Sequence, residues 1–171
     1  MFHVGDYIIY GSNGVCKVDK VGPMDFDGVS RDRMYYTLIP VYSKGSKVFT
    51  PIDNHKVVMR PILTTEEANA LIDNIQSIDV MWESDDRKRE EAFKEALRSC
   101  DCREWIKIVK TLYLRRKKRI EAGKKVTASD GKYLYLAEDS LYGELAVALN
   151  MKKEKVEEFI VERVKRLNKE I

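Results

Sequence analysis

The sequence is poor in the residues that build covalent or metal-centred chemistry. Three cysteines, an odd number, and two histidines occur among 171 residues, which argues against a disulfide framework and for a reducing compartment. No run approaches the roughly 18 consecutive apolar residues of a membrane helix. The opening "MFHVGDYIIY" lacks the basic and then apolar layout of a secretion signal. We therefore expect a cytoplasmic protein with no membrane contact.

The few soft metal ligands are scattered. Cys100 and Cys102 form a C-x-C pair, but Cys16, His3 and His55 lie far from them in the sequence, and no zinc spacing results. We interpret the pair as free, partly buried thiols rather than as metal ligands or a redox centre.

Motifs for catalysis are also missing. His55 stands in a predicted turn beside Asn54 with no Ser or Cys nucleophile close to it in sequence, so a catalytic triad is unsupported. Gly11 and Gly14 bracket a predicted hairpin and do not lead into a helix, as a phosphate-binding loop would. The sequence therefore predicts a protein that is not an enzyme, with no catalytic residue, metal, cofactor or small-molecule substrate.

Proline is confined to the first part of the chain, where the pattern is that of strands. None of the four prolines follows Pro61. Gly11 to Gly14 separate two apolar runs as a hairpin turn does, and further β-rich runs alternate with turn residues. The predicted strands lie in residues 6–11, 15–21, 33–41, 47–52 and 56–62. Five short strands with close turns suggest a small barrel or a strongly bent sheet.

After Pro61 the apolar residues follow a helical period. Thr64 and Glu67 have capping-box spacing, and a second helix should begin near Ser84, capped by Asp79 or Ser84 itself. Later boundaries are predicted by Asp101 and Thr127 as helix starts and by Gly123 and Asn150 as helix ends. Hydrophobic residues at 44% suffice for a core, while charged residues at 35% indicate much exposed helix surface.

Charge is distributed unevenly, although the net charge is only +3. Residues 61–109 carry seven basic and twelve acidic side chains, whereas residues 110–125 carry eight basic and one acidic. The second stretch includes five consecutive bases, Arg115 to Arg119, which cannot all face a core. They form either a solvated face that complements the helix dipole or a patch that binds phosphates.

A lone tryptophan precedes a run of charged residues in "VMWESDDRKREEAF", residues 80–93. Trp82 either packs back beside Val80 and Met81 or projects outward from the connection between two helices. In the second case Arg87 and Arg89 would lie nearby, and an apolar wedge flanked by bases suits the minor groove of DNA. The residue pattern alone leaves both interpretations open.

Several motifs together resemble one family. The order of "VGDYIIYGSNGVCKV", "VFTPIDN" at 48–54, Trp82 with its basic followers, and "LYGELA" at 141–146 resembles the CarD/CdnL family of bacterial transcription regulators. The resemblance implies a Tudor-like domain, related to the polymerase-interacting domain of the transcription-repair coupling factor, and a helical domain that contacts promoter DNA. The expected fold class is α+β: a Tudor/SH3-like β-barrel of about five strands, residues 1–61, then an all-α domain of about five helices, residues 62–171.

The resemblance also implies a function and a set of contact residues. The β domain would bind the lobe of the RNA polymerase β subunit, and Trp82 would enter the minor groove at the upstream edge of the melted −10 region, lengthening the life of the open complex. The protein would then associate with the nucleoid through polymerase. The implied DNA contacts are Trp82, Arg87, Lys88, Arg89, Arg115, Arg116 and Lys132, and the polymerase contacts are Met24, Phe26, Lys47 and Phe49.

One departure from the family pattern keeps an alternative open. Glu83 to Asp86 are acidic or polar where some members have arginine almost at once. The alternative is a polymerase- or protein-binding adaptor of the same fold with little DNA contact. On the polymerase face, Phe49 lies either on the surface as a contact or inside the small barrel.

Overall fold

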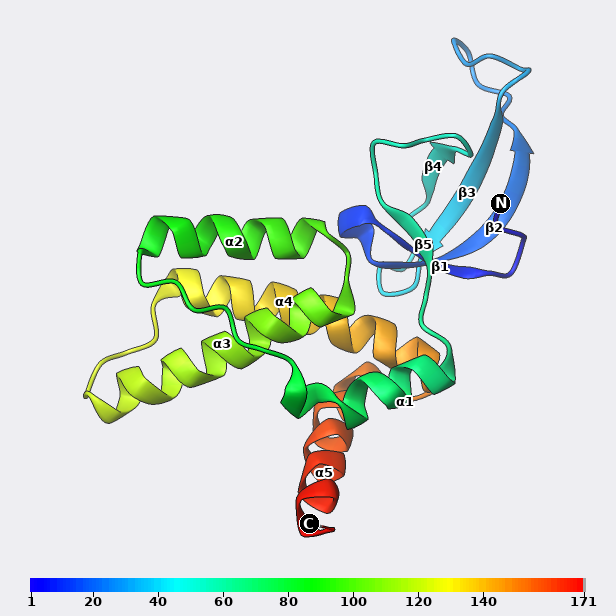
Figure 1. Cartoon of the computed structure of the whole chain (residues 1–171). Helices are drawn as coiled ribbons and strands as arrows, with labels where there is room; N and C mark the ends of the chain where they lie inside the picture. The colour runs from blue at the N-terminus through cyan, green and yellow to red at the C-terminus, as the bar shows by residue number, and fades with distance from the viewer. Residues whose placement is uncertain (171) are drawn as a thin grey trace. The chain divides into compact units, whose positions relative to one another are not determined.

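The computed structural model describes residues 1–170. The chain forms two compact units, Met1–Ile62 and Leu63–Ile171, and each is described by itself. Figure 1 shows strands in the first unit and helices in the second. The α+β prediction is confirmed.

The first unit is one antiparallel sheet in the strand order β4-β3-β2-β1-β5. Because β4 and β5 stand at the two ends of this order, they are the edge strands of the sheet. A shift in register between Val18 and Lys20 interrupts the pairing of β2 with β3, and such a bulge bends a strand and increases its twist. The strands are β1 (Tyr7–Tyr10), β2 (Val15–Pro23), β3 (Met34–Pro40), β4 (Val48–Pro51) and β5 (Met59–Pro61).

One face of this sheet carries the core of the unit. Ile8, Val18 and Leu38 are fully buried and belong to one hydrophobic cluster. Each stands two residues from another member of the cluster on its own strand, a spacing that places both side chains on the same face. Phe2 covers this core from the N-terminal segment: its ring lies 5.8 Å from that of Tyr36, and its backbone N–H donates to the Tyr36 hydroxyl.

The second unit contains five α-helices. The predicted capping box is present at its start, where Thr64 and Glu67 satisfy each other's backbone N–H groups. Asp101 and Thr127 cap the third and fourth helices as expected, and the predicted stops Gly123 and Asn150 both have positive φ. The helices are α1 (Thr65–Asp73), α2 (Asp86–Arg98), α3 (Cys102–Glu121), α4 (Ala128–Ala148) and α5 (Val156–Lys169).

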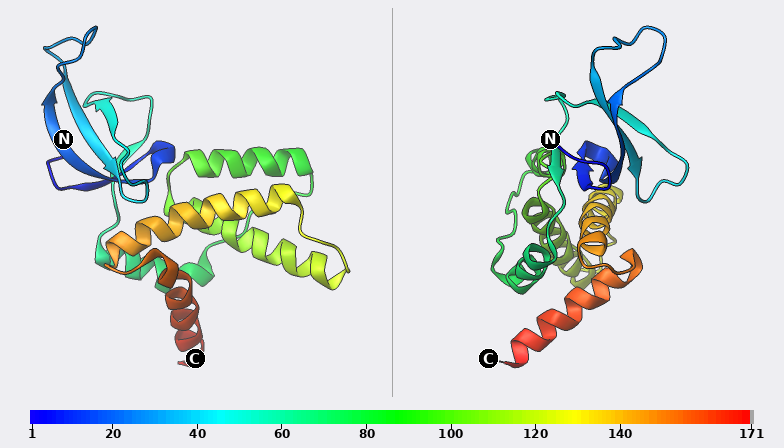
Figure 2. Two further views of the ribbon diagram at one scale, coloured as in Figure 1. Left: turned by 180° about the vertical axis from the view of Figure 1, so that it is seen from behind. Right: turned by 90° about the vertical axis from the view of Figure 1, so that its right-hand side faces the viewer.

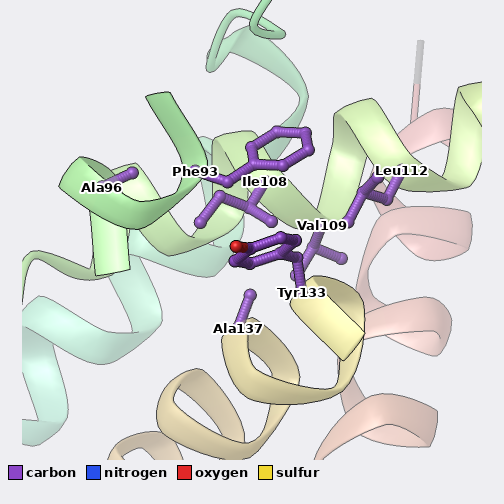
Figure 3. Packing of buried hydrophobic residues seen from close by; sticks show 7 residues of the cluster. All are labelled: Phe93, Ala96, Ile108, Val109, Leu112, Tyr133 and Ala137. Atoms are coloured by element: carbon purple, nitrogen blue, oxygen red, sulfur yellow. The ribbon is translucent and has the colours of Figure 1, made fainter. Parts of the chain in front are cut away.

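The core of the helical unit lies where α2, α3 and α4 meet. Both views in Figure 2 show α2 beside α4. In Figure 3, Phe93 of α2 and Ile108 of α3 converge on Tyr133 of α4. The rings of Phe93 and Tyr133 are 5.7 Å apart, and the Tyr133 hydroxyl donates to Glu90 Oε1 at 2.9 Å. The polar end of this tyrosine is therefore satisfied while its ring fills the core.

Candidate nucleic-acid interface

Trp82 lies on the irregular connection between a short 3-10 helix, η2 (Ile75–Ser77), and α2. Its side chain is 68% exposed, the highest value of any aromatic residue in this part of the chain. The packed alternative is therefore wrong. Met81, the preceding residue, instead packs against the core cluster of α2, α3 and α4. Adjacent side chains thus diverge, one inward and one to solvent.

The start of this connection is attached to α3, which it crosses in Figure 1. The Met81 backbone N–H donates to Thr111 Oγ1 at 2.8 Å. Lys110, the residue before Thr111 on α3, donates from its ammonium group to the carbonyl oxygens of Ile75 and Ile78. These bonds satisfy backbone groups that an irregular segment cannot pair by itself.

The end of the connection is held by Arg89, which corrects one prediction. This side chain was expected to face phosphate, but the residue is only 7% exposed. Its Nη1 donates to the Glu83 carbonyl at 3.2 Å and its Nη2 to Asp86 Oδ1 at 2.6 Å. The hydrogen bond and charge of Arg89 hold the pKa of the Asp86 carboxyl below its ordinary value. Arg89 is thus engaged inside the protein and does not face solvent as a phosphate ligand.

The acidic residues after Trp82 have local structural roles. Asp85, rather than Asp79 or Ser84, caps α2, and its carboxylate accepts from the Lys88 backbone N–H at 2.9 Å. Glu83 Oε1 accepts from the Asp85 backbone N–H at 3.1 Å. These carboxylates organise the first turn of the helix, where the dipole favours negative charge.

The basic run on α3 supplies the group closest to the tryptophan. Lys118 Nζ lies 4.8 Å from the centroid of the Trp82 ring, within range of a cation–π interaction. The predicted contact Arg115 is half-buried and paired with Asp130, its Nε 3.0 Å from Oδ2, whereas Arg116 is exposed. Arg87 and Lys88, at the start of α2, are exposed as well.

Lys118 was predicted only as a member of the basic run Arg115 to Arg119, and Thr111 was not singled out in the sequence, although a spacing connects the two residues. Thr111, Arg115 and Lys118 stand at positions i, i+4 and i+7 of α3, which places them on one face of a helix. All three line a hollow of about 510 Å³ together with Trp82. The spacing is readable from the sequence, but nothing in it says that this face meets the connection. Lys132, the remaining predicted contact, is exposed near the start of α4, with Nζ 5.6 Å from the centroid of the Tyr133 ring.

In the first unit, a pair of aromatic rings stands at the β4 edge. Phe26 is 57% and Phe49 44% exposed, and the rings meet edge to face with centroids 5.8 Å apart. The alternative that places Phe49 inside the barrel is therefore wrong; its neighbour Thr50 points inward. Of the other predicted polymerase contacts, Lys47 is exposed and Met24 is half-buried.

The thiols of Cys16, Cys100 and Cys102 are buried, and none of them forms a disulfide. The Cys102 thiol donates to the buried carboxylate of Glu144 at 2.9 Å, and burial raises the pKa of the Cys16 thiol to about 11. Within residues 1–170, no three His, Cys, Asp or Glu side chains are arranged to hold a metal ion. In the same range, no helix is both long and apolar enough to cross a membrane.

The chain thus consists of a small β unit with an exposed aromatic pair and a helical unit that presents an exposed tryptophan beside basic residues. Residues 2–63 match the family model of the CarD-like/TRCF RID domain, and residues 70–161 match that of the CarD C-terminal domain. The chain belongs to the CarD/CdnL family, whose domains are those of transcription regulators that interact with RNA polymerase and are not known as enzymes. No individually curated protein matches it.

Proposed function

We propose that the β unit binds the lobe of the RNA polymerase β subunit while Trp82 enters the minor groove at the upstream edge of the melted −10 region. The observation that carries this proposal is the 68% exposure of Trp82 on a connection whose backbone is tied to α2 and α3. An indole exposed to this extent is available to a partner, and tryptophan is among the residues that most often dominate the energetics of interfaces. In this role the protein accompanies polymerase on the nucleoid.

An indole suits a site where DNA is already partly open. Inserting an apolar side chain between base pairs costs a few kcal/mol for the unstacked step. Stacking of a base on an aromatic side chain returns about 1–3 kcal/mol. The wedge therefore binds the melted junction better than closed duplex, and this differential affinity shifts the equilibrium toward the open complex.

The phosphate contacts differ from the set predicted from sequence because Arg89 is buried. A basic side chain can bind a DNA phosphate only if it is exposed. The best candidates for phosphate contacts are therefore Arg87 and Lys88 at the start of α2, and Arg116 and Lys118 on α3. Arg115 contributes less because Asp130 already holds it. Lys132 remains a candidate for a more distant phosphate. Such contacts add salt-dependent affinity without sequence preference.

The β unit supplies the anchor. β4 is an edge strand, and an edge offers unpaired backbone groups to a strand of the partner. Phe26 and Phe49 lie beside this edge as exposed aromatic groups, which are frequent energetic centres of interfaces. Anchoring on polymerase raises the local concentration of the helical unit at the promoter, so two modest contacts act as one.

The proposed function is tested by the lifetime of promoter complexes. Bacterial RNA polymerase is assembled on a promoter with an unstable open complex, a competitor is added, and decay is followed with and without this protein. We expect a longer lifetime in its presence. If polymerase binds the protein but the lifetime is unchanged, the proposal is rejected and the protein is an adaptor with little DNA contact.

Phe49→Ala is expected to weaken polymerase binding by about tenfold, because truncating an aromatic anchor at an interface commonly costs more than 1 kcal/mol. Affinity for the isolated β lobe is measured by titration. The matched control is Tyr7→Ala: Tyr7 is also exposed but lies on β1, three strands from β4 in the sheet order. Equal losses for both variants would show that the contact is not at the β4 edge.

Lys118→Met is expected to shorten the open-complex lifetime about two- to fivefold and to reduce the salt dependence of DNA binding by about one phosphate contact. Lys118 covers one face of the Trp82 ring and must leave it when a nucleobase of the DNA stacks there. Its ammonium group can then bind a neighbouring phosphate. Lys165→Met makes the same charge change on α5. If both variants lower the salt dependence equally, Lys118 acts only through net charge.

A further inference from the structure

The backbone on both sides of Trp82 is held by side chains from two different helices. Since residues 79–84 lie in neither helix nor strand, their polar backbone groups depend on partners elsewhere. We propose that Thr111 and Arg89 are positioning residues that hold the 81–83 peptide so that Trp82 points into solvent. The inference rests on the proposed function, since what it positions is the wedge.

Thr111 fixes the residue before the tryptophan. The threonine is 3% exposed, and its hydroxyl donates to the Lys107 carbonyl at 2.6 Å. The hydroxyl proton is committed to that carbonyl, so a lone pair remains for the Met81 backbone N–H at 2.8 Å. With the amide of Met81 fixed and its side chain in the core, the next side chain is left on the solvent side of the connection, where the Trp82 ring lies beside the exposed Lys118 of α3.

Arg89 fixes the residue after the tryptophan. One arm of its guanidinium binds the Glu83 carbonyl and the other binds Asp86. The ion pair with Asp86 is weak grounds for stability, because solvent screens the attraction of a charge at the surface. Asp86 itself is 91% exposed. The bond to the connection is therefore what this buried arginine contributes.

Together the two residues reduce the conformations open to Trp82. A side chain that is presented correctly only part of the time binds more weakly in proportion to that fraction. If losing one bond lowers the correctly presented fraction to about one tenth, the gain in open-complex lifetime falls about tenfold. This loss occurs without removing any DNA contact or any polymerase contact.

The experiment separates presentation of the indole from its action on DNA. Trp82 and Trp105 are the two tryptophans, and Trp105 is 2% exposed. Acrylamide quenching and fluorescence anisotropy therefore report on Trp82, with Trp82→Ala defining the Trp105 background. At position 111, Thr111→Val keeps the shape of the side chain but removes the hydroxyl, and Thr111→Ser keeps the hydroxyl. At position 89, Arg89→Met removes the charge, and Arg89→Lys keeps it.

We expect Thr111→Val and Arg89→Met to lower Trp82 anisotropy and to reduce the gain in open-complex lifetime about tenfold relative to wild type. Thr111→Ser should restore both readouts to near wild type. Arg89→Lys should not, since one ammonium group lacks the fork that reaches Glu83 and Asp86 together. Circular dichroism checks that each variant is folded; should Arg89→Met unfold, the Thr111 pair decides the matter.

Two results would overturn the inference. One is wild-type anisotropy in folded Thr111→Val and Arg89→Met. The other is a mobile Trp82 with an unchanged lifetime, in a system where Trp82→Ala does shorten it. If wild type itself fails to lengthen the lifetime, the proposed function is rejected, while the anisotropy data still show whether Thr111 and Arg89 hold the indole.

Discussion

Trp82→Ala is expected to shorten the lifetime gained by the promoter open complex by about 5- to 150-fold, which corresponds to the loss of about 1–3 kcal/mol of base stacking. The variant should fold normally. A side chain 68% exposed contributes little to stability, and surface substitutions usually change it by no more than about 0.5 kcal/mol. Affinity for the β lobe should also be unchanged, because the proposed anchor lies in the other unit.

Tyr135→Ala provides the matched control for this experiment. Tyr135 of α4 is 67% exposed, so the two variants remove exposed aromatic area of similar extent from the same unit. Only Trp82→Ala should lose the effect on lifetime. If both variants behave as wild type, Trp82 is not the wedge and the basic face of α3 carries the contact with DNA.

Phe93→Ala is expected to destabilise the helical unit by about 3–5 kcal/mol, the usual cost of removing a buried aromatic side chain. Phe93 is 1% exposed and belongs to a cluster of buried residues from α2, α3 and α4, which Figure 3 shows. Tyr133 and Ile108 cannot collapse into the space without moving whole helices, so most of the cavity should persist. Urea denaturation followed by circular dichroism measures the loss.

Ile120→Ala is the comparison for this second prediction. It also removes a large apolar side chain from the helical unit, but Ile120 is 57% exposed at the end of α3, and we expect a change of no more than about 0.5 kcal/mol. A loss below about 1 kcal/mol for Phe93→Ala would contradict the importance of the α2–α3–α4 core. Phe93 and Arg89 both lie on α2. Phe93→Ala should therefore also disturb Arg89 and lower the fluorescence anisotropy of Trp82.

The acidic stretch after Trp82 was the main reason to consider an adaptor without DNA contact. Each of its carboxylates has an internal role: Glu83 and Asp85 organise the first turn of α2, and Asp86 pairs with Arg89. Their charge is partly balanced by nearby bases, since Arg115 and Arg119 also lower the pKa of Asp86. The stretch is therefore compatible with a DNA-facing tryptophan.

Features that depend on neighbouring residues were predictable from sequence. The capping box at Thr64 and Glu67, the caps Asp101 and Thr127, and the strand and helix periods all follow from interactions within a few residues. The cap of α2 was missed because Asp79, Ser84 and Asp85 are all competent, and propensity does not rank them.

The candidate site depends on contacts between distant segments, and for that reason only the folded chain could reveal it. Trp82 points outward because the backbone beside it bonds to Thr111, thirty residues away in sequence. Arg89 is buried because the connection folds back over its side chain, whereas its neighbour Lys88 on the same helix is exposed. The residue types indicated an indole and a group of basic side chains. The packing of the Trp82 connection against α2 and α3 decided which of these side chains face solvent.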